Sequence, residues 1–230
     1  MHFAGYAIPI ALQKDIGTLL IYLGMFVAMI FVAGIYFRYI AIFAVLGVAA
    51  VPLIWTHLSD YQQARIIYGF QPELDPLGYG LQPIVSKIAI GSGGVSGLGY
   101  GNGIQNQNSL LPEKATDFIF AIVGEEFGFI GCIAVLFLIL VIAVLVIKNG
   151  ILAKDKAGAY LCTAVGVMLL LQSCINIGMC VGLSPVIGVT LPFVSYGGSS
   201  ILSLFVCMGF VQGVRIKPER VLSFAKKRRR

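Results

Sequence analysis

The chain has 230 residues, of which 58% are hydrophobic and 11% are charged, and its mean hydropathy is +0.93. Soluble domains carry about a quarter charged residues, so this composition excludes an ordinary soluble protein and predicts an integral membrane protein. The net charge of +6 does not indicate nucleic-acid binding, because the basic residues are distributed as membrane topology requires. All five cysteines lie in apolar runs without metal-site spacing, so we interpret them as small hydrophobic residues.

The apolar segments predict the fold class. A helix that crosses the hydrocarbon core needs about twenty apolar residues. The first apolar stretch, 3–12, is too short to cross, and we expect it to be the end of a span whose beginning is missing. Five later segments are expected to span: 16–37, 39–55, 117–147, 157–183 and 199–214. We therefore predict an all-α polytopic integral membrane protein with five full spans, an N-terminal partial helix and a long extracytoplasmic loop, all in one domain, 1–230.

The basic residues predict the orientation of these spans. If the spans alternate, 12 of the 16 Lys and Arg residues lie on one side of the membrane. These twelve are Arg38, the lysines of the connector 148–156 and the basic residues of the tail from Arg215. That side is expected to be cytoplasmic. The segment 56–116, Asp117 and the loop 184–196 then face outward. An outward segment of about sixty residues is long for a featureless loop, so we expect structure in it, including a short interfacial helix over 82–90. The terminal residues 226–230 either anchor this topology or contact anionic lipid.

The first candidate site group is the charged pair Lys14 and Asp15, which precedes the first full span. Asp15 is well placed to cap that helix, and a direct role in a site is the alternative. Lys14 could offset the acid or meet an anionic ligand.

The second group is a glycine-dense loop, GSGGVSGLGYG at 91–101, followed by amide side chains up to Asn108. Glycine lets a backbone approach a ligand closely. The loop lacks the lysine and threonine of a nucleotide P-loop, and no parallel-strand pattern precedes it. It could bind sugar hydroxyls or phosphate oxygens, or it could be a flexible connector.

The third group consists of acids at the start of a span: Glu113, Asp117, Glu125 and Glu126. Ionisable residues in a membrane span are costly and are functional candidates by default. The spacing from Asp117 to Glu125 puts both on one helix face, and Thr116 can cap the helix. An acid in a partly dry cavity can serve as a general base near neutral pH. The alternative is that Asp117 only stabilises the positive end of the helix dipole.

The fourth group is LPFVSYGGSS at 191–200, where proline and paired glycines interrupt a helical pattern. Irregular backbone at membrane depth requires a covering of protein or a water-filled cavity. No histidine or acid is nearby in sequence to activate the serines, so a serine hydrolase is not expected. His2 and His57 stand alone and do not indicate a metal site.

Taken together, seven blocks in order resemble the SEDS family of membrane glycosyltransferases, which includes RodA and FtsW. The blocks are KDIGT at 14–18, DPLGYG at 75–80, SKIAIGSGG at 86–94, LPE at 111–113, TDFIF at 116–120, EEFGFIG at 125–131 and LPFVSYGGSS at 191–200. The sequence around Lys87 resembles the RodA elongation branch more than the FtsW division branch. Family members have about ten spanning helices, so we expect this chain to correspond to their C-terminal part. Departures from the family pattern include Lys14 and Ala115, where Pro and His are usual.

The resemblance implies a bacterial plasma-membrane enzyme that polymerises lipid II into peptidoglycan during cell-wall elongation and cell-shape maintenance. Asp117 would be the general base that deprotonates the acceptor sugar's 4-hydroxyl, and Glu125 would be a second catalytic acid. Lys14, Arg65, Lys87 or a divalent cation, Mg²⁺ or Mn²⁺, would offset the leaving pyrophosphate. The expected partner is a class B penicillin-binding protein, a transpeptidase. The residues expected to bind substrate are Lys14, Asp15, Lys87, Ser92, Gly93, Gly94, Glu113, Thr116, Ser195, Tyr196, Gly197, Gly198 and Ser199.

Two other functions stay open on the sequence. A flippase or transporter of lipid-linked precursors would use the acids for ion coupling and the 191–200 segment as a gate. A non-catalytic membrane scaffold would use its helices to bind a partner. We also expect the 230-residue chain by itself to be inactive, because its acids would lack the surrounding helices.

Overall fold

The computed structural model describes residues 13, 15–107 and 116–215, and every element in these ranges is helical. The long helices are α2 (Ile16–Val32), α3 (Phe37–His57), α7 (Ile119–Ile151), α8 (Lys156–Val181) and α9 (Gly198–Arg215). Shorter helices lie between α3 and α7: α4 (Asp60–Phe70), η1 (Pro72–Leu74), α5 (Leu81–Gly93) and α6 (Ile104–Gln107).

The predicted fold class is confirmed, with shifted boundaries. Four of the long helices are long and apolar enough to cross a membrane, and α2 is an apolar helix of 17 residues. The first predicted span, 16–37, ends early at Val32, because Gly34 has a φ of +89° and turns the chain before α3 begins. The helix predicted over 82–90 is present as α5. Helix α4 in the same segment was not predicted.

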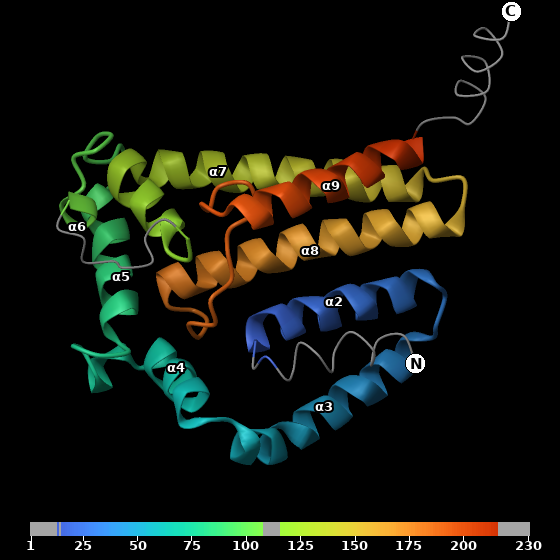
Figure 1. Cartoon of the computed structure of the whole chain (residues 1–230), viewed down its shortest axis with the longest axis horizontal. Helices are drawn as coiled ribbons and strands as arrows, with labels where there is room; N and C mark the ends of the chain where they lie inside the picture. Colours follow the sequence, from blue (N-terminus) through green and yellow to red (C-terminus); the bar gives the residue numbers. More distant parts are fainter. Residues whose placement is uncertain (1–12, 14, 108–115, 216–230) are drawn as a thin grey trace, which may run out of the picture.

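Helices α7, α8 and α9 run side by side, and α2 lies along α8 (Figure 1). Helix α3 lies at the edge, and none of its most apolar stretch is buried within the described chain. Helices α4, α5 and α6 gather at the end of the bundle where α2 begins and α8 ends, which we call the loop end. One buried cluster lies at the loop end between α5, α7, α8 and residues 186–191, and another joins α7, α8 and α9.

Helix α7 is broken at Gly128, which has a φ of +66°. The break frees backbone groups, and the glycine loop after α5 supplies their partners. The amides of Leu98 and Gly99 each donate over 3.0 Å to the carbonyls of Glu125 and Glu126. In the other direction, the amides of Phe129 and Ile130 donate to the carbonyls of Gly94 and Val95, over 2.9 and 3.2 Å. This exchange satisfies polar backbone that a membrane would otherwise leave unpaired.

The loop needs its glycines because it lies against backbone. A Cβ on Gly93 would collide with the carbonyl oxygen of Gly124, and one on Gly97 would collide with the carbonyl of Glu126. The described part of this loop is therefore a packed segment, which argues against the alternative of a flexible connector.

Candidate active site

Asp117 lies in a turn just before α7 rather than on the helix. The residue that caps α7 is Phe118, and no side chain caps it, so the prediction that Thr116 caps this helix is wrong. For the same reason Asp117 and Glu125 do not share a face of one regular helix. Asp117 is half-buried, and its position depends on the loop between α8 and α9.

The Asp117 carboxylate and the Arg65 guanidinium both approach Gly188. A Cβ built on Gly188 would lie 3.4 Å from a carboxylate oxygen of Asp117 and 3.4 Å from a guanidinium nitrogen of Arg65. Gly188 has a φ of +72°, a conformation that favours glycine. An acid from the turn before α7 and a permanent cation from α4 thus flank a residue without a side chain.

Hydrogen bonds hold the backbone of this acid in place. The Asn176 side chain on α8 donates to the carbonyl of Asp117 over 2.8 Å and to that of Val189 over 2.6 Å. Asn176 is fully buried. The Ser195 hydroxyl donates to the carbonyl of Thr116 over 2.6 Å and accepts from the amide of Leu191 over 2.7 Å. The loop between α8 and α9 and the turn before α7 are therefore tied together.

Asp15 lies at the start of α2, and this end of the helix packs on the same loop. Its carboxylate accepts a hydrogen bond from the amide of Thr18 over 2.9 Å, so the predicted capping role is confirmed. Gly17, one residue into the helix, packs on the loop: its Cβ would lie 3.0 Å from the carbonyl oxygen of Ile187 and 2.8 Å from the Val189 side chain. The start of α2 therefore lies next to Gly188.

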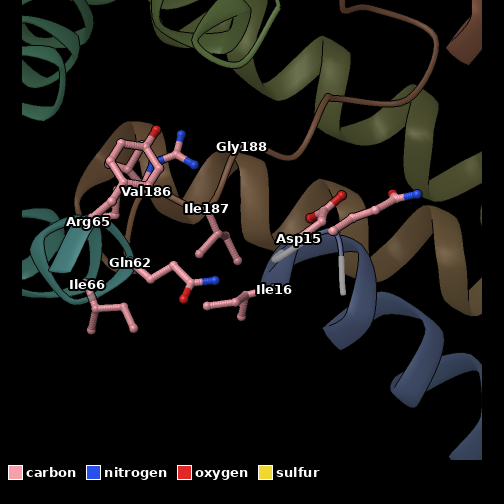
Figure 2. A pocket seen from close by; sticks show the side chains of 10 residues that line it. Asp15, Ile16, Gln62, Arg65, Ile66, Val186, Ile187 and Gly188 are labelled. Atoms are coloured by element: carbon pink, nitrogen blue, oxygen red, sulfur yellow. The ribbon is translucent and has the colours of Figure 1, made fainter. Parts of the chain in front are cut away.

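Two adjoining pockets lie at this place. A pocket of about 270 Å³ is lined by α2, α4 and the loop at 186–188, and Figure 2 shows Asp15 and Arg65 on either side of Ile187. A second pocket, of about 770 Å³, is lined mainly by apolar residues of α2 and α3 such as Leu19, Ile54 and Trp55. The pockets share Asp15, Ile16, Gln62 and Ile66. A polar pocket with Asp15 and Arg65 thus adjoins an apolar one between α2 and α3. Asp117 lines neither pocket and reaches the first one through Gly188.

Glu125 contacts a different segment. Its side chain is fully buried, its carboxylate accepts a hydrogen bond from the amide of Gln105 over 2.8 Å, and it lies against Gly103. These contacts hold the turn before α6. Glu126 is also buried, and its carbonyl takes part in the exchange at the α7 break.

Other predicted site residues on α5 do not line the two pockets. Lys87 lies over Gly182 at the C-terminal end of α8, and the neighbouring Ser86 donates to the carbonyl of Cys180 over 2.9 Å. A lysine there complements the negative end of the helix dipole. The Ser92 hydroxyl donates to its own helix at Ala89. Gly93 and Gly94 belong to the packed loop at the α7 break.

The remaining predicted residues lie at or near the start of α9, or outside the described residues. Tyr196 is exposed, the carbonyl of Gly197 accepts the amide of Ile201, and the carbonyl of Ser199 accepts the hydroxyl of Ser203. Gly198 begins α9. Nearby, Phe193 has a φ of +64°, which is unusual for a residue other than glycine. Lys14 and Glu113 lie outside the described residues. Within the described ranges, no three His, Cys, Asp or Glu side chains are grouped to hold a metal ion.

Sequence reasoning missed Asn176 and Gly188. Asn176 carried a usable signal, because an amide inside an apolar span is costly unless it has partners. Gly188 carried none, since the importance of that glycine depends on Arg65 and Asp117, which are distant in sequence.

A family model described as cell cycle protein, for FtsW, RodA and SpoVE, matches residues 2–219. The chain is 40% identical over 212 residues to the peptidoglycan glycosyltransferase MrdB of Escherichia coli strain K12, covering 89% of the chain and 56% of that protein. It is 39% identical over 203 residues to stage V sporulation protein E of Bacillus subtilis strain 168, covering 88% of the chain and 55% of that protein. A chain from a solved peptidoglycan synthase complex, in which polymerisation and crosslinking are coordinated, matches with a TM-score of 0.75 at 27% identity, covering 91% of this chain and 58% of that one. The chain thus spans a little more than half the length of these relatives.

Proposed function

Because the chain belongs to the FtsW, RodA and SpoVE family of cell cycle proteins, we propose that it forms part of an inverting glycosyltransferase that polymerises lipid II into peptidoglycan. Relatives that are named peptidoglycan glycosyltransferases support this proposal. We place its role in cell-wall elongation and cell-shape maintenance, by analogy with the RodA branch.

The observation that carries the proposal is the pair of adjoining pockets. Lipid II joins a disaccharide-pentapeptide to a long polyprenyl chain through a pyrophosphate. The polar pocket is lined by Arg65 and by Gly188, which the Asp117 carboxylate approaches, and it suits the sugar and pyrophosphate. The larger apolar pocket between α2 and α3 suits the polyprenyl chain. A substrate with both parts needs both environments side by side.

In the proposed reaction, Asp117 accepts the proton of the acceptor sugar's 4-hydroxyl. The oxygen attacks the anomeric carbon of the donor, a new C–O bond forms with inversion, and the bond from that carbon to the pyrophosphate oxygen breaks. Undecaprenyl pyrophosphate leaves with the electron pair. Arg65 is always protonated, so it can offset the negative charge that grows on the pyrophosphate. Asn176 and Ser195 hold the backbone that carries the base.

A Mg²⁺ or Mn²⁺ ion was an alternative source of positive charge. Within the described residues, no three His, Cys, Asp or Glu side chains are grouped to hold such an ion. Mg²⁺ needs only one or two carboxylates beside substrate phosphates, so the substrate pyrophosphate would supply the remaining ligands. The reaction proposed above is written with Arg65 in that role.

The proposed setting is the bacterial plasma membrane, with the loop end outside and the connector between α7 and α8 in the cytoplasm. The proposed partner is a class B penicillin-binding protein, a transpeptidase. The structural match to a chain of a peptidoglycan synthase complex supports such an assembly.

The test uses purified lipid II and joins the chain to the N-terminal part of a relative. We expect the 230-residue chain in nanodiscs to be inactive, and a hybrid carrying the N-terminal part of Escherichia coli MrdB to make glycan strands. In the hybrid, Asp117→Asn should lower the rate by about 10²–10⁴-fold, the usual contribution of a general base. Asp155→Asn is the matched control, because Asp155 caps α8 at the opposite end of the bundle.

Three results would contradict the proposal or its parts. Parental activity of the Asp117→Asn hybrid would refute the assignment of the base. Polymerisation by the short chain alone would refute the expectation that further helices are needed. Translocation of fluorescent lipid II across vesicles, without any glycan product, would favour the transporter.

A further inference from the structure

Three tyrosines, Tyr61, Tyr68 and Tyr79, form a partly exposed aromatic cluster at the loop end. Tyr61 and Tyr68 lie on α4, and Tyr79 lies on the turn before α5. The rings of Tyr68 and Tyr79 are nearly parallel, with an interplanar angle of 2° and centroids 5.9 Å apart. Tyr61 meets Tyr79 edge-on at 6.0 Å. Even so, Tyr61 keeps 53% of its surface exposed and Tyr79 keeps 48%.

The cluster is continuous with the polar pocket. Tyr61 lines that pocket, and the Arg65 guanidinium lies 5.2 Å from the centroid of its ring. Positions 61, 65 and 68 recur at helical spacing, so the two tyrosines and the arginine share one face of α4. The aromatic surface therefore begins at the cation beside Asp117 and extends away from it.

The turn that carries Tyr79 is closely specified. The Asp75 carboxylate accepts hydrogen bonds from the amides of Gly78 and Tyr79, over 3.1 and 2.9 Å. The carbonyl of Asp75 accepts from the amide of Gly80 over 3.0 Å, and a Cβ on Gly80 would collide with the carbonyl of Pro72. These hydrogen bonds fix the turn, so the half-exposed Tyr79 ring is held in place before a ligand binds. Such preorganisation lowers the entropic cost of binding.

We propose that Tyr61 and Tyr79 form a binding site for a glycan strand, next to the polar pocket. This inference rests on the proposed function, since it places the sugars that lie beyond the reacting one. Pyranose rings present faces of C–H bonds that stack on aromatic rings, and tyrosine hydroxyls can hydrogen-bond to sugar hydroxyls. A platform that begins at Arg65 and continues over Tyr61 and Tyr79 would hold the strand while its end is in the pocket.

A binding experiment without lipid II tests the proposal. The probe is a fluorescent tetrasaccharide of alternating N-acetylglucosamine and N-acetylmuramic acid, titrated against the purified chain in nanodiscs. We expect saturable binding that Tyr79→Leu, which keeps apolar surface but removes the ring, weakens roughly tenfold, or about 1.4 kcal/mol. Tyr79→Phe should retain most of the binding, and thermal unfolding reports whether each variant is folded.

Phe70→Ala is the matched control, because Phe70 is an equally exposed aromatic residue on α4 that has no ring contact with the cluster in the described structure. If Tyr79→Leu binds the probe like the parent, or if Phe70→Ala weakens binding as much, the cluster is not a glycan site and serves as an interfacial aromatic belt. Asp117→Asn should leave probe binding intact. A failure of the proposed reaction and a failure of this site are therefore distinguishable.

Discussion

Asn176 offers the sharpest test of how the candidate base is positioned. Its amide is fully buried on α8 and donates to two carbonyls, those of Asp117 and Val189. Both hydrogens of the amide are therefore used, while its oxygen has no hydrogen-bond partner in the described structure. Asn176→Leu has a similar volume and removes both donors.

The hydrogen bonds of Asn176 set the size of the expected loss in unfolding free energy. Each buried carbonyl that loses its donor costs about 1–3 kcal/mol. Two factors reduce the total: the unpaired amide oxygen disappears, and the Cys180 thiol remains 3.8 Å from the carbonyl of Asp117. We expect a net loss of unfolding free energy of about 1–4 kcal/mol. The rate should also fall, by about 10²-fold, because a small displacement of a catalytic group is costly.

The assay combines thermal unfolding in nanodiscs with steady-state kinetics of the MrdB hybrid on lipid II, at a temperature where parent and variant are both folded. We expect kcat to fall while KM changes little, because Asn176 does not line either pocket. Asn176→Asp keeps the shape but can donate at most one hydrogen bond, so it should be impaired as well.

Ser173→Ala is the control for this experiment, since Ser173 is also buried on α8 but donates to its own helix at Leu169. It should keep the parental kcat. An Asn176→Leu variant with parental kcat would refute the positioning role, and equal losses in Ser173→Ala would mean that any disturbance of α8 has this effect.

Three further predictions concern the loop end and the topology. Gly93→Ala should destabilise the chain by several kcal/mol in thermal unfolding, because its Cβ would meet the Gly124 carbonyl, whereas Gly91→Ala, with open space around it, should be neutral. Glu125→Gln should unfold near the parental temperature, because it can still accept from Gln105, and Glu125→Ala should lose about 1–3 kcal/mol; the reverse order would contradict the structural role of this acid. In whole cells, a membrane-impermeant thiol reagent should label a cysteine at Asn106 and miss one at Asn149, and the opposite pattern would invert the proposed orientation.

The resemblance in sequence located the acid, but not its surroundings. TDFIF at 116–120 singled out Asp117, and the family comparisons agree with the resemblance. Lys87, Ser92 and the glycines at 93 and 94 were grouped with it because they share the same family pattern. In the structure Lys87 lies over the end of α8, Ser92 donates to its own helix, and the two glycines pack at the break in α7. Packing contacts alone account for the positions of Lys87 and the two glycines, so a shared motif does not by itself identify a substrate-binding residue.

The sequence by itself determined the membrane class, the five long helices and the cap at Asp15, because these depend on composition and on contacts between near neighbours. Apolar length is a property of a segment, and a capping bond joins residues three apart. Only the tertiary structure decided that Asp117, Arg65 and Gly188 meet, and that the glycine loop completes the broken helix α7. Those contacts join segments far apart in the chain, and they depend on how α4, α7 and the loop after α8 pack. Local sequence patterns do not predict that packing.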